Sequence, residues 1–299
     1  MLIPAGLIIL SIGSSYVFIP GELNVGAARV AQCNLSGAFR SVADGRSLEK
    51  WWPAGGIGGY SCRMEGSVYP QVGLVLEKEG QFFHGMLSVL SAGLSDSISL
   101  IWQCRISCSS LPWRRWQQYR EAVRLREVMQ AGVDSLKSFL GKMENVYGTD
   151  IRNVMLLDST LVQTTKMMSR YPVPADIYPS IHSMRAYIAG QGAKEIDFPM
   201  LHVERRSDSV YECTIAIPVD RELRGTKEFV PVRFVPWKVL RGEVRGGTVT
   251  AAQAMVQLQY YAADHQLTMM AMPFQSLVTE RDQEPDTTRW VTRVVVPVP

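Results

Sequence analysis

The residues that could do metal or nucleophilic chemistry are spread thinly along this chain. The four histidines are His84, His182, His202 and His265. None of them has a cysteine or a carboxylate at the short spacing that a shared metal ion needs. The cysteines are Cys33, Cys62, Cys104, Cys108 and Cys213, an odd number without a CxxC pair. We therefore expect buried free thiols, no metal site and no cofactor.

Phosphate-binding and nucleic-acid-binding signals are weak. The glycine-rich stretch PAGGIGGY at 53–60 has no Lys-Ser pair after it, so we interpret it as a flexible loop. The formal net charge is +3, from 31 basic and 28 acidic residues, which favours no nucleic-acid partner. The densest basic cluster lies at 114–126, where Arg115 and four other arginines are interleaved with Glu121 and Glu127. We interpret this cluster as a solvated helix face.

The first twenty residues carry no charged side chain, and the first charge is Glu22. About twenty apolar residues in a helix cross the hydrocarbon core of a bilayer. Neither a basic segment before the run nor a small-residue cleavage site after it is present, so a membrane anchor at 1–20 is favoured over a cleaved signal peptide. A buried first strand or helix is the remaining alternative. We expect anchoring in the bacterial inner membrane, with the side undetermined because no flanking charge orients the segment.

The rest of the first half predicts strands around two short helices, followed by a long helix from about 116 to 147. The strand-like segments are GELNVGAARVAQC, GYSCRMEG, QVGLVLEK, FFHGMLSVLS and SISLIWQCRIS. The short helices are LSGAFRSVAD and SLEKWWP, and Val133, Leu136 and Leu140 belong to an apolar stripe on the long one. This order of elements and the LEKWWP motif resemble the START-like (SRPBCC, polyketide-cyclase-like) superfamily. The resemblance implies a helix-grip domain at 21–148 that encloses an apolar cavity.

The second half repeats one pattern of elements, which is strand, helix, strand and strand. Single strands are expected at 151–164 and across PVRFVPWKVLRGEVRGG, and helices at 174–189 and 251–265. The segments DIYPSIHSMRAYI, RGEVRGG and MPFQSLVTERDQEPDTTRWVTRVVVPV resemble GyrI-like effector-binding domains. The resemblance implies such a domain at 149–299, with two βαββ repeats. The expected fold class is α+β, a START-like helix-grip domain followed by a GyrI-like domain.

The GyrI-like resemblance also implies a ligand cleft between the two helices and the sheet. In many members a carboxylate on the strand after the second helix faces cationic groups, and Gln275 stands at that position here. An amide offers one acceptor and two donors without charge, so Gln275 can orient a polar ligand but cannot neutralise a cation. Gln275 cannot take a proton either, which argues against hydrolysis through this residue. We therefore expect a neutral or weakly polar ligand, and we expect Glu280, five residues on, to be solvated.

Aromatic side chains stack on the ligand in such domains. The candidates here are Tyr178, Tyr187, Trp237, Phe274 and Trp290, with ordinary core packing as the alternative for each. The predicted ligand-binding set is Tyr178, Trp237, Phe274, Gln275 and Trp290, and Trp237 is the aromatic residue we favour most.

Three functions compete on these observations. The first is a membrane-anchored protein that binds or senses a small hydrophobic or amphipathic molecule. The second is a hydrolase-type or cyclase-type enzyme, which would need Glu204, Glu212 or Glu243 to point into the cleft. The third is a structural role with an unknown protein partner, whose mark would be a large exposed apolar patch.

Overall fold

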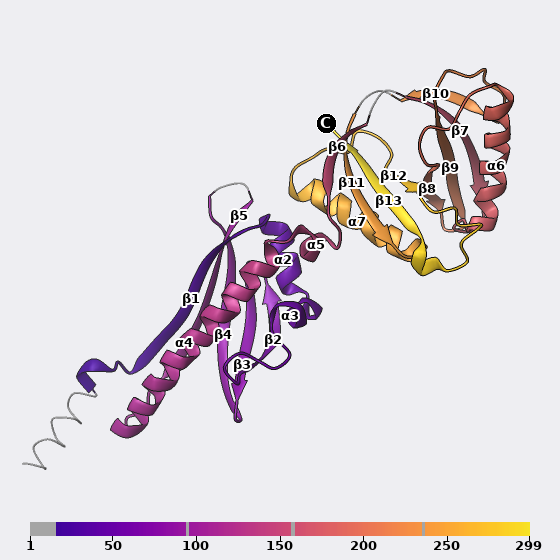
Figure 1. The fold of residues 1–299 in the computed structure, drawn as a ribbon. Helices are drawn as coiled ribbons and strands as arrows, with labels where there is room; N and C mark the ends of the chain where they lie inside the picture. Colours follow the sequence, from indigo (N-terminus) through magenta and orange to yellow (C-terminus); the bar gives the residue numbers. More distant parts are fainter. Residues whose placement is uncertain (1–15, 94–95, 157–158, 235–236) are drawn as a thin grey trace, which may run out of the picture. The chain divides into compact units, whose positions relative to one another are not determined.

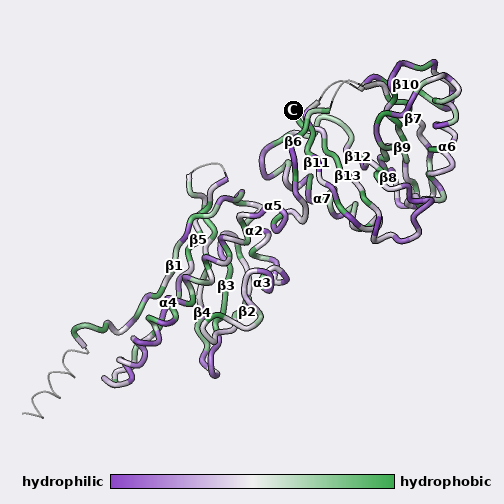
Figure 2. The backbone as a smooth tube through the Cα atoms, in the orientation of Figure 1, coloured by the Kyte–Doolittle hydropathy of each residue, from purple (hydrophilic) through white to green (hydrophobic). Residues whose placement is uncertain are grey.

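The computed structural model describes residues 16–93, 96–156, 159–234 and 237–299. The chain divides into two compact units, the first ending at Val146 and the second spanning Tyr147–Pro299 (Figure 1). Each unit combines helices with an antiparallel sheet, which confirms the α+β class. Hydrophobic residues follow the interior strands, as Figure 2 shows for β13 (Val291–Val298).

The described strands of the first unit form one sheet in the order β1-β5-β4-β3-β2. These strands are β1 (Glu22–Gln32), β2 (Ser61–Val68), β3 (Gln71–Lys78), β4 (Gln81–Ser91) and β5 (Ser97–Ser107). The helices are α2 (Leu35–Ala43), α3 (Gly45–Trp51), α4 (Pro112–Leu140) and α5 (Met143–Tyr147). Helix α4 packs along β1 and β5. The order of elements is the predicted one, while the START-like assignment itself stays a prediction.

The long helix differs from its predicted bounds at both ends. It begins at Pro112, because proline is well tolerated in the first helical turn, where its missing N–H leaves no bond unmade. It ends at Leu140, where the N–H of Gly141 closes the last turn on the carbonyl of Lys137. The residues after Lys142 then form the separate helix α5, so the single helix expected to run to 147 is two helices.

Part of the predicted membrane anchor belongs to the fold of the first unit. Ile19 is buried, and its carbonyl accepts a hydrogen bond of 2.9 Å from Nε of Arg115. Arg115 also lies over the ring of Tyr16. Its side chain is therefore buried, which corrects the interpretation that all the arginines of 114–126 form a solvated face.

The localisation prediction is corrected as well. Within the described ranges, no helix is both long enough and apolar enough to cross a membrane. The prediction of a protein anchored in the bacterial inner membrane is wrong on this finding. The other part of the predicted anchor, residues 1–15, lies outside the described residues.

The described strands of the second unit form a sheet in the order β10-β7-β9-β8-β12-β13-β11-β6. The strands not yet given are β6 (Arg152–Leu156), β7 (Ser159–Met168), β8 (Met200–Ser207), β9 (Val210–Val219), β10 (Val230–Phe234), β11 (Trp237–Arg245) and β12 (Phe274–Leu277). The helices are α6 (Pro174–Gly190) and α7 (Thr248–Asp264), and a 3-10 turn covers Thr287–Arg289. The two βαββ repeats are β7-α6-β8-β9 and β11-α7-β12-β13.

Each repeat receives its outer strand from the other repeat. Strand β6 directly precedes β7 in the chain but pairs with β11, and β10 directly precedes β11 but pairs with β7. The pairing of β11 with β6 and the pairing of β10 with β7 have the same register: Leu156 pairs with Trp237, and Ser159 pairs with Phe234. The two segments expected as single strands, at 151–164 and 231–247, are therefore each divided between the two halves of the sheet.

Both helices cover the same face of this sheet. The register places Leu201, Gln275, Val294 and Gly242 side by side on four neighbouring strands, so these residues share that face. Leu201 packs into the core under α6. At the other end, a Cβ on Gly242 would lie 3.1 Å from the side chain of Leu258 on α7. Gln275 and Val294 therefore lie between the parts of the sheet that α6 and α7 cover.

Candidate ligand-binding site

Gln275 lies in the middle of the sheet with a polar atom left over. Its side chain is 8% exposed, and its Oε1 is buried without a hydrogen-bond partner among the described residues. The Gln275 side chain hydrogen-bonds the hydroxyl of Tyr171. Burial raises the pKa of this hydroxyl, and the hydrogen bond with Gln275 offsets part of that rise. The ring of Tyr171 in turn packs edge-on against Tyr211, with 5.9 Å between ring centroids. Buried polar atoms without partners are uncommon in native proteins, so this amide calls for an explanation.

Arg281 is the second polar group on this face, and it is 5% exposed. Its Nη2 donates to Oγ1 of Thr292 at 2.7 Å, while its Nε is buried without a partner in the described part of the chain. Burial lowers the pKa of Arg281, and the hydroxyls of Tyr178 and Tyr171 oppose that effect. The guanidinium carbon lies 5.0 Å from the centroid of the Trp290 ring. Six residues define what we call the Arg281 site: Tyr171, Tyr178, Gln275, Arg281, Trp290 and Thr292.

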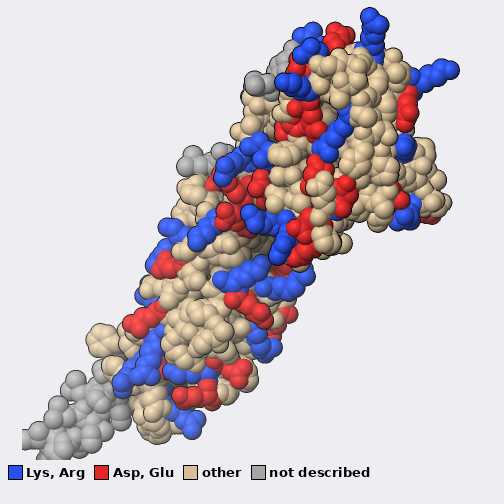
Figure 3. Space-filling model, turned by 45° about the vertical axis from the view of Figure 1, so that its right-hand side comes forward, with Lys and Arg blue, Asp and Glu red and all other residues tan. Residues whose placement is uncertain are grey.

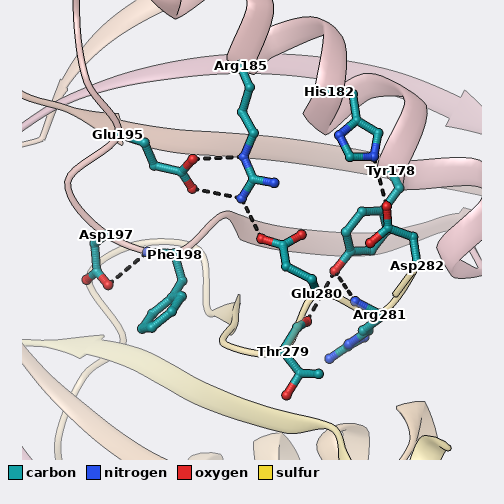
Figure 4. A network of polar contacts seen from close by, with 10 residues as sticks. All are labelled: Tyr178, His182, Arg185, Glu195, Asp197, Phe198, Thr279, Glu280, Arg281 and Asp282. Atoms are coloured by element: carbon teal, nitrogen blue, oxygen red, sulfur yellow. Dashed lines mark hydrogen bonds and ion pairs between the residues drawn. The ribbon is translucent and has the colours of Figure 1, made fainter. Parts of the chain in front are cut away.

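A loop at 279–290 delivers Arg281 and Trp290 to the site. Its ends are tied together, because the N–H of Val291 donates to Oγ1 of Thr279 at 2.9 Å. Tyr178 of α6 joins the loop twice, since its hydroxyl donates to the carbonyl of Thr279 and accepts from the N–H of Arg281 at 2.6 Å (Figure 4). The indole N–H of Trp290 donates to the carbonyl of Glu284 at 2.7 Å, which fixes the ring within the loop.

The acidic neighbours of Arg281 point away from it, toward α6. Glu280 pairs with Arg185 at 2.6 Å, and Asp282 contacts Nε2 of His182 at 2.8 Å (Figure 4). Arg185 also holds Glu195 at 2.8 Å, and both carboxylates raise the pKa of Arg185. The expectation that Glu280 is solvated is therefore corrected. These pairs fix the loop on the helix, and no acidic side chain of the described residues pairs with Arg281.

Only part of the predicted ligand-binding set meets in the Arg281 site. Tyr178, Gln275 and Trp290 belong to it. Phe274 lies on the opposite face of the sheet, where it packs with Val239. Neighbouring residues of a strand point to opposite faces, so Phe274 and Gln275 cannot share one site.

The remaining aromatic candidates are Trp237 and Tyr187. Trp237 begins β11 and pairs with Leu156 of the edge strand, and its side chain is outside what the structure describes. Tyr187 packs against Phe229 and donates to the carbonyl of Arg224.

The three carboxylates that an enzyme would have used do not face the helices. Glu204 and Glu212 oppose each other on β8 and β9, and Arg206 bridges them at 3.0 and 2.9 Å. Glu243 pairs with Arg293 at 3.1 Å on the neighbouring strand. The register places all three on the face opposite Gln275. None of these three carboxylates therefore faces the Arg281 site.

Tyr171, Arg281 and Thr292 are the site residues that sequence reasoning missed. Arg281 stands in the run TERDQEPDTT, whose many polar residues predict an exposed turn. The one usable signal is that Trp290 follows this run, since a loop that closes over a buried tryptophan brings part of itself inside. Thr292 could have been found from β13, where it precedes Val294 and Val296 on the same face of the strand.

Three hollows of the described surface lie away from this site. Hollows of about 470, 360 and 520 Å³ lie beside Arg233 on β10, beside Gln118 on α4 and beside Asn24 on β1. Among the residues that the structure describes, no group of three or more His, Cys, Asp or Glu could hold a metal ion. On the face shown in Figure 3, basic and acidic side chains are intermixed.

No family model and no curated protein sequence matches the chain. Among solved structures, it is similar to the EcmrR C-terminal domain, with 10% identity and a TM-score of 0.44 over 50% of this chain and 98% of that one. It is also similar to EcmrR in a DNA complex, with 11% identity and a TM-score of 0.46 over 62% and 70%. SAV2435 bound to tetraphenylphosphonium follows, with 14% identity and a TM-score of 0.36 over 50% and 94%.

These likenesses are partial, so the function of the chain has to be argued from its own residues. The two βαββ repeats agree with the resemblance to GyrI-like domains. The expectation of a chain without a nucleic-acid partner stays a prediction.

Proposed function

We propose that this chain binds a small molecule, and that the ligand occupies the Arg281 site of the second unit. The observation that carries the proposal is a pair of buried polar atoms without partners among the described residues, Oε1 of Gln275 and Nε of Arg281, on two side chains that both lie near Tyr171. Aromatic rings of Tyr171 and Trp290 lie beside them. Ligand sites are typically lined by apolar and aromatic groups with a few convergent polar atoms, which is the composition found here.

The proposed role is binding or sensing rather than catalysis. Each of the three carboxylates named for an enzyme forms an ion pair with an arginine on the other face of the sheet. Tyr171 and Tyr178 are held in hydrogen bonds, and burial raises the pKa of both hydroxyls. A phenol with a raised pKa stays protonated near neutral pH, so almost no phenolate is present to act as a base. These groups can therefore orient a ligand but are badly suited to accepting its proton.

We infer that the first unit contains a START-like domain, predicted at 21–148, and that the second unit contains a GyrI-like domain, predicted at 149–299. The order of elements and the packing of α4 along β1 and β5 support the first inference. The interior of that unit is filled at one point, because Trp52 and Trp102 pack so closely on Gly132 that a Cβ there would lie 2.6 Å from the Trp52 ring. This close packing favours the second unit as the place of binding.

The test is a thermal-shift screen of the full chain against aromatic small molecules of all charge types, followed by calorimetry on the hits. Gln275→Leu removes the amide, with its unpartnered Oε1, while keeping similar volume, and we expect it to weaken the hits by about tenfold or more. The matched control is Gln253→Leu on the exposed side of α7, which should change affinity less than about twofold. A screen without hits, or hits that both variants bind equally well, would show that the proposed site is wrong.

A further inference from the structure

Arg281 carries a buried positive charge that the described residues do not neutralise. It is 5% exposed, and within the described part of the chain its side chain hydrogen-bonds only the neutral hydroxyl of Thr292. The two adjacent acids, Glu280 and Asp282, pair with Arg185 and His182 instead. A buried charge is costly to fold unless it is paired, so a guanidinium in this position indicates an anion that is supplied from outside the chain.

The groups around Arg281 suit an anion attached to an aromatic body. The Arg281 guanidinium lies over the Trp290 ring, so the ring contacts its flat face. The N–H groups at the edge of the guanidinium, including Nε, are therefore available for an oxyanion. Tyr171 provides a second aromatic ring, and it lies close enough to Arg281 for the positive charge to lower the pKa of its hydroxyl. Oε1 of Gln275 is an unused acceptor that can take an N–H or O–H from the same molecule.

We propose that the ligand of the Arg281 site is an amphipathic organic anion, a carboxylate, sulfonate or phosphate on an aromatic or apolar body, with Arg281 as its charge-selecting residue. This proposal rests on the proposed binding function and replaces the expectation of a neutral or weakly polar ligand. The neutral amide of Gln275 fits it, because a carboxylate at that position would compete with the ligand for Arg281.

Three flat probes of nearly equal shape separate charge from size: 2-naphthoate, 2-naphthamide and 2-naphthamidinium. In calorimetry on the full chain at neutral pH, 2-naphthoate should bind about tenfold or more tightly than 2-naphthamide, with the cation weakest. Equal or tighter binding of the amide or the cation overturns the charge assignment while leaving a small-molecule site in place. Binding of none of the three counts against both proposals.

Variants assign the selectivity to Arg281. Arg281→Met should weaken 2-naphthoate by about tenfold or more and leave 2-naphthamide within about threefold, whereas Arg281→Lys should keep part of the preference. Arg289→Met removes an arginine of the same loop whose side chain is 72% exposed, and it should bind all three probes as the unaltered chain does. Gln275→Glu places a carboxylate near Arg281 and should weaken 2-naphthoate relative to the cation.

Melting curves establish which variants fold. If Arg281→Met is unfolded, the probe series on the unaltered chain and the Gln275→Glu variant decide the question. An Arg281→Met protein that folds and binds 2-naphthoate with unchanged affinity overturns the proposal, as does a Gln275→Glu protein with an unchanged order of the three probes.

Discussion

Nη2 of Arg185 and Oε1 of Glu280 lie 2.6 Å apart, and this ion pair joins helix α6 to the loop that carries Arg281. The same guanidinium holds Glu195 through Nε at 2.8 Å. About a third or less of each of these three side chains is exposed, so solvent screens the pairs only in part. The loop at 279–290 is thus fixed on α6 by charge as well as by the Tyr178 hydroxyl.

Replacing Arg185 should loosen that loop. Arg185→Met removes both ion pairs, and we expect a loss of roughly 1 to 2 kcal/mol in the free energy of unfolding, measured in urea. Limited proteolysis should cut the variant within 279–290 faster than the unaltered chain. Arg289→Met is the control, because its exposed side chain contributes little. Equal cleavage rates in the two variants would mean that Arg185 does not hold the loop.

The hydrogen bond from Arg281 to Thr292 should contribute to the free energy of unfolding. Thr292→Val keeps the volume but removes the acceptor, which leaves a buried guanidinium with a further unpaired N–H. The expected loss is roughly 1 to 3 kcal/mol in the free energy of unfolding. Thr292→Ser keeps the hydroxyl and should lose less, although it removes a methyl group. Denaturant titrations of both variants distinguish this bond from simple packing, which would rank them in the opposite order.

Gly242 has no room for a side chain between the sheet and Leu258 of α7. A Cβ there would lie 2.9 Å from Cγ2 of Thr149 and 3.1 Å from the Leu258 side chain. Gly242→Ala should therefore destabilise the second unit by roughly 1 to 3 kcal/mol through overpacking. Gly190→Ala, at the end of α6, meets no atom within 4 Å and should be neutral or slightly stabilising. Thermal melting of both variants checks the contrast.

The buried thiols should be unreactive in the folded chain. Burial raises the pKa of the thiols of Cys104 and Cys213 to about 11, from an ordinary value of 9.0. At pH 8 we therefore expect iodoacetamide to label both cysteines about a hundredfold more slowly than in the unfolded chain, as peptide mass spectrometry can show. Fast labelling of either residue in the native protein would contradict its burial.

The same pKa shifts predict how stability depends on pH. The folded pKa of each thiol is above the unfolded one, so the unfolded state loses its protons first as the pH rises. The contribution of these thiols is therefore fully present below about pH 8.5 and falls as the pH rises toward 11. Urea titrations between pH 8 and 10 should show this decline, and Cys213→Ala should show less of it.

Elements with a clear period could be predicted, whereas the site depended on contacts that no local pattern reveals. The spans 71–78 and 97–107 were expected as strands and are β3 and β5, because β-branched and aromatic residues are grouped between turn signals. The apolar stripe of α6, with Ile177 and Ile181, is buried as its spacing indicates. These regularities fix where the two helices lie on the second sheet.

The charge that defines the site could not be read in the same way. Arg281 stands between two acids in a polar run, and its burial results from its neighbours pairing with α6 while it turns inward. Phe274 and Gln275 were assigned to one cleft, although neighbouring residues of a strand point to opposite faces. Tertiary pairing conceals the position of Arg281, whereas the two-residue period of a strand already separates Phe274 from Gln275.

The exchange of edge strands in the second unit sets the order in which that unit can form during synthesis. The first repeat, β7-α6-β8-β9, leaves the ribosome with its outer edge unpaired, because β10 begins only at Val230. Strand β6 cannot pair until β11, which comes after β10 in the chain, has been synthesised. We therefore expect neither repeat to be a stable folding intermediate, and the second unit to appear in one late, cooperative step whose rate is limited by contacts between distant parts of the chain.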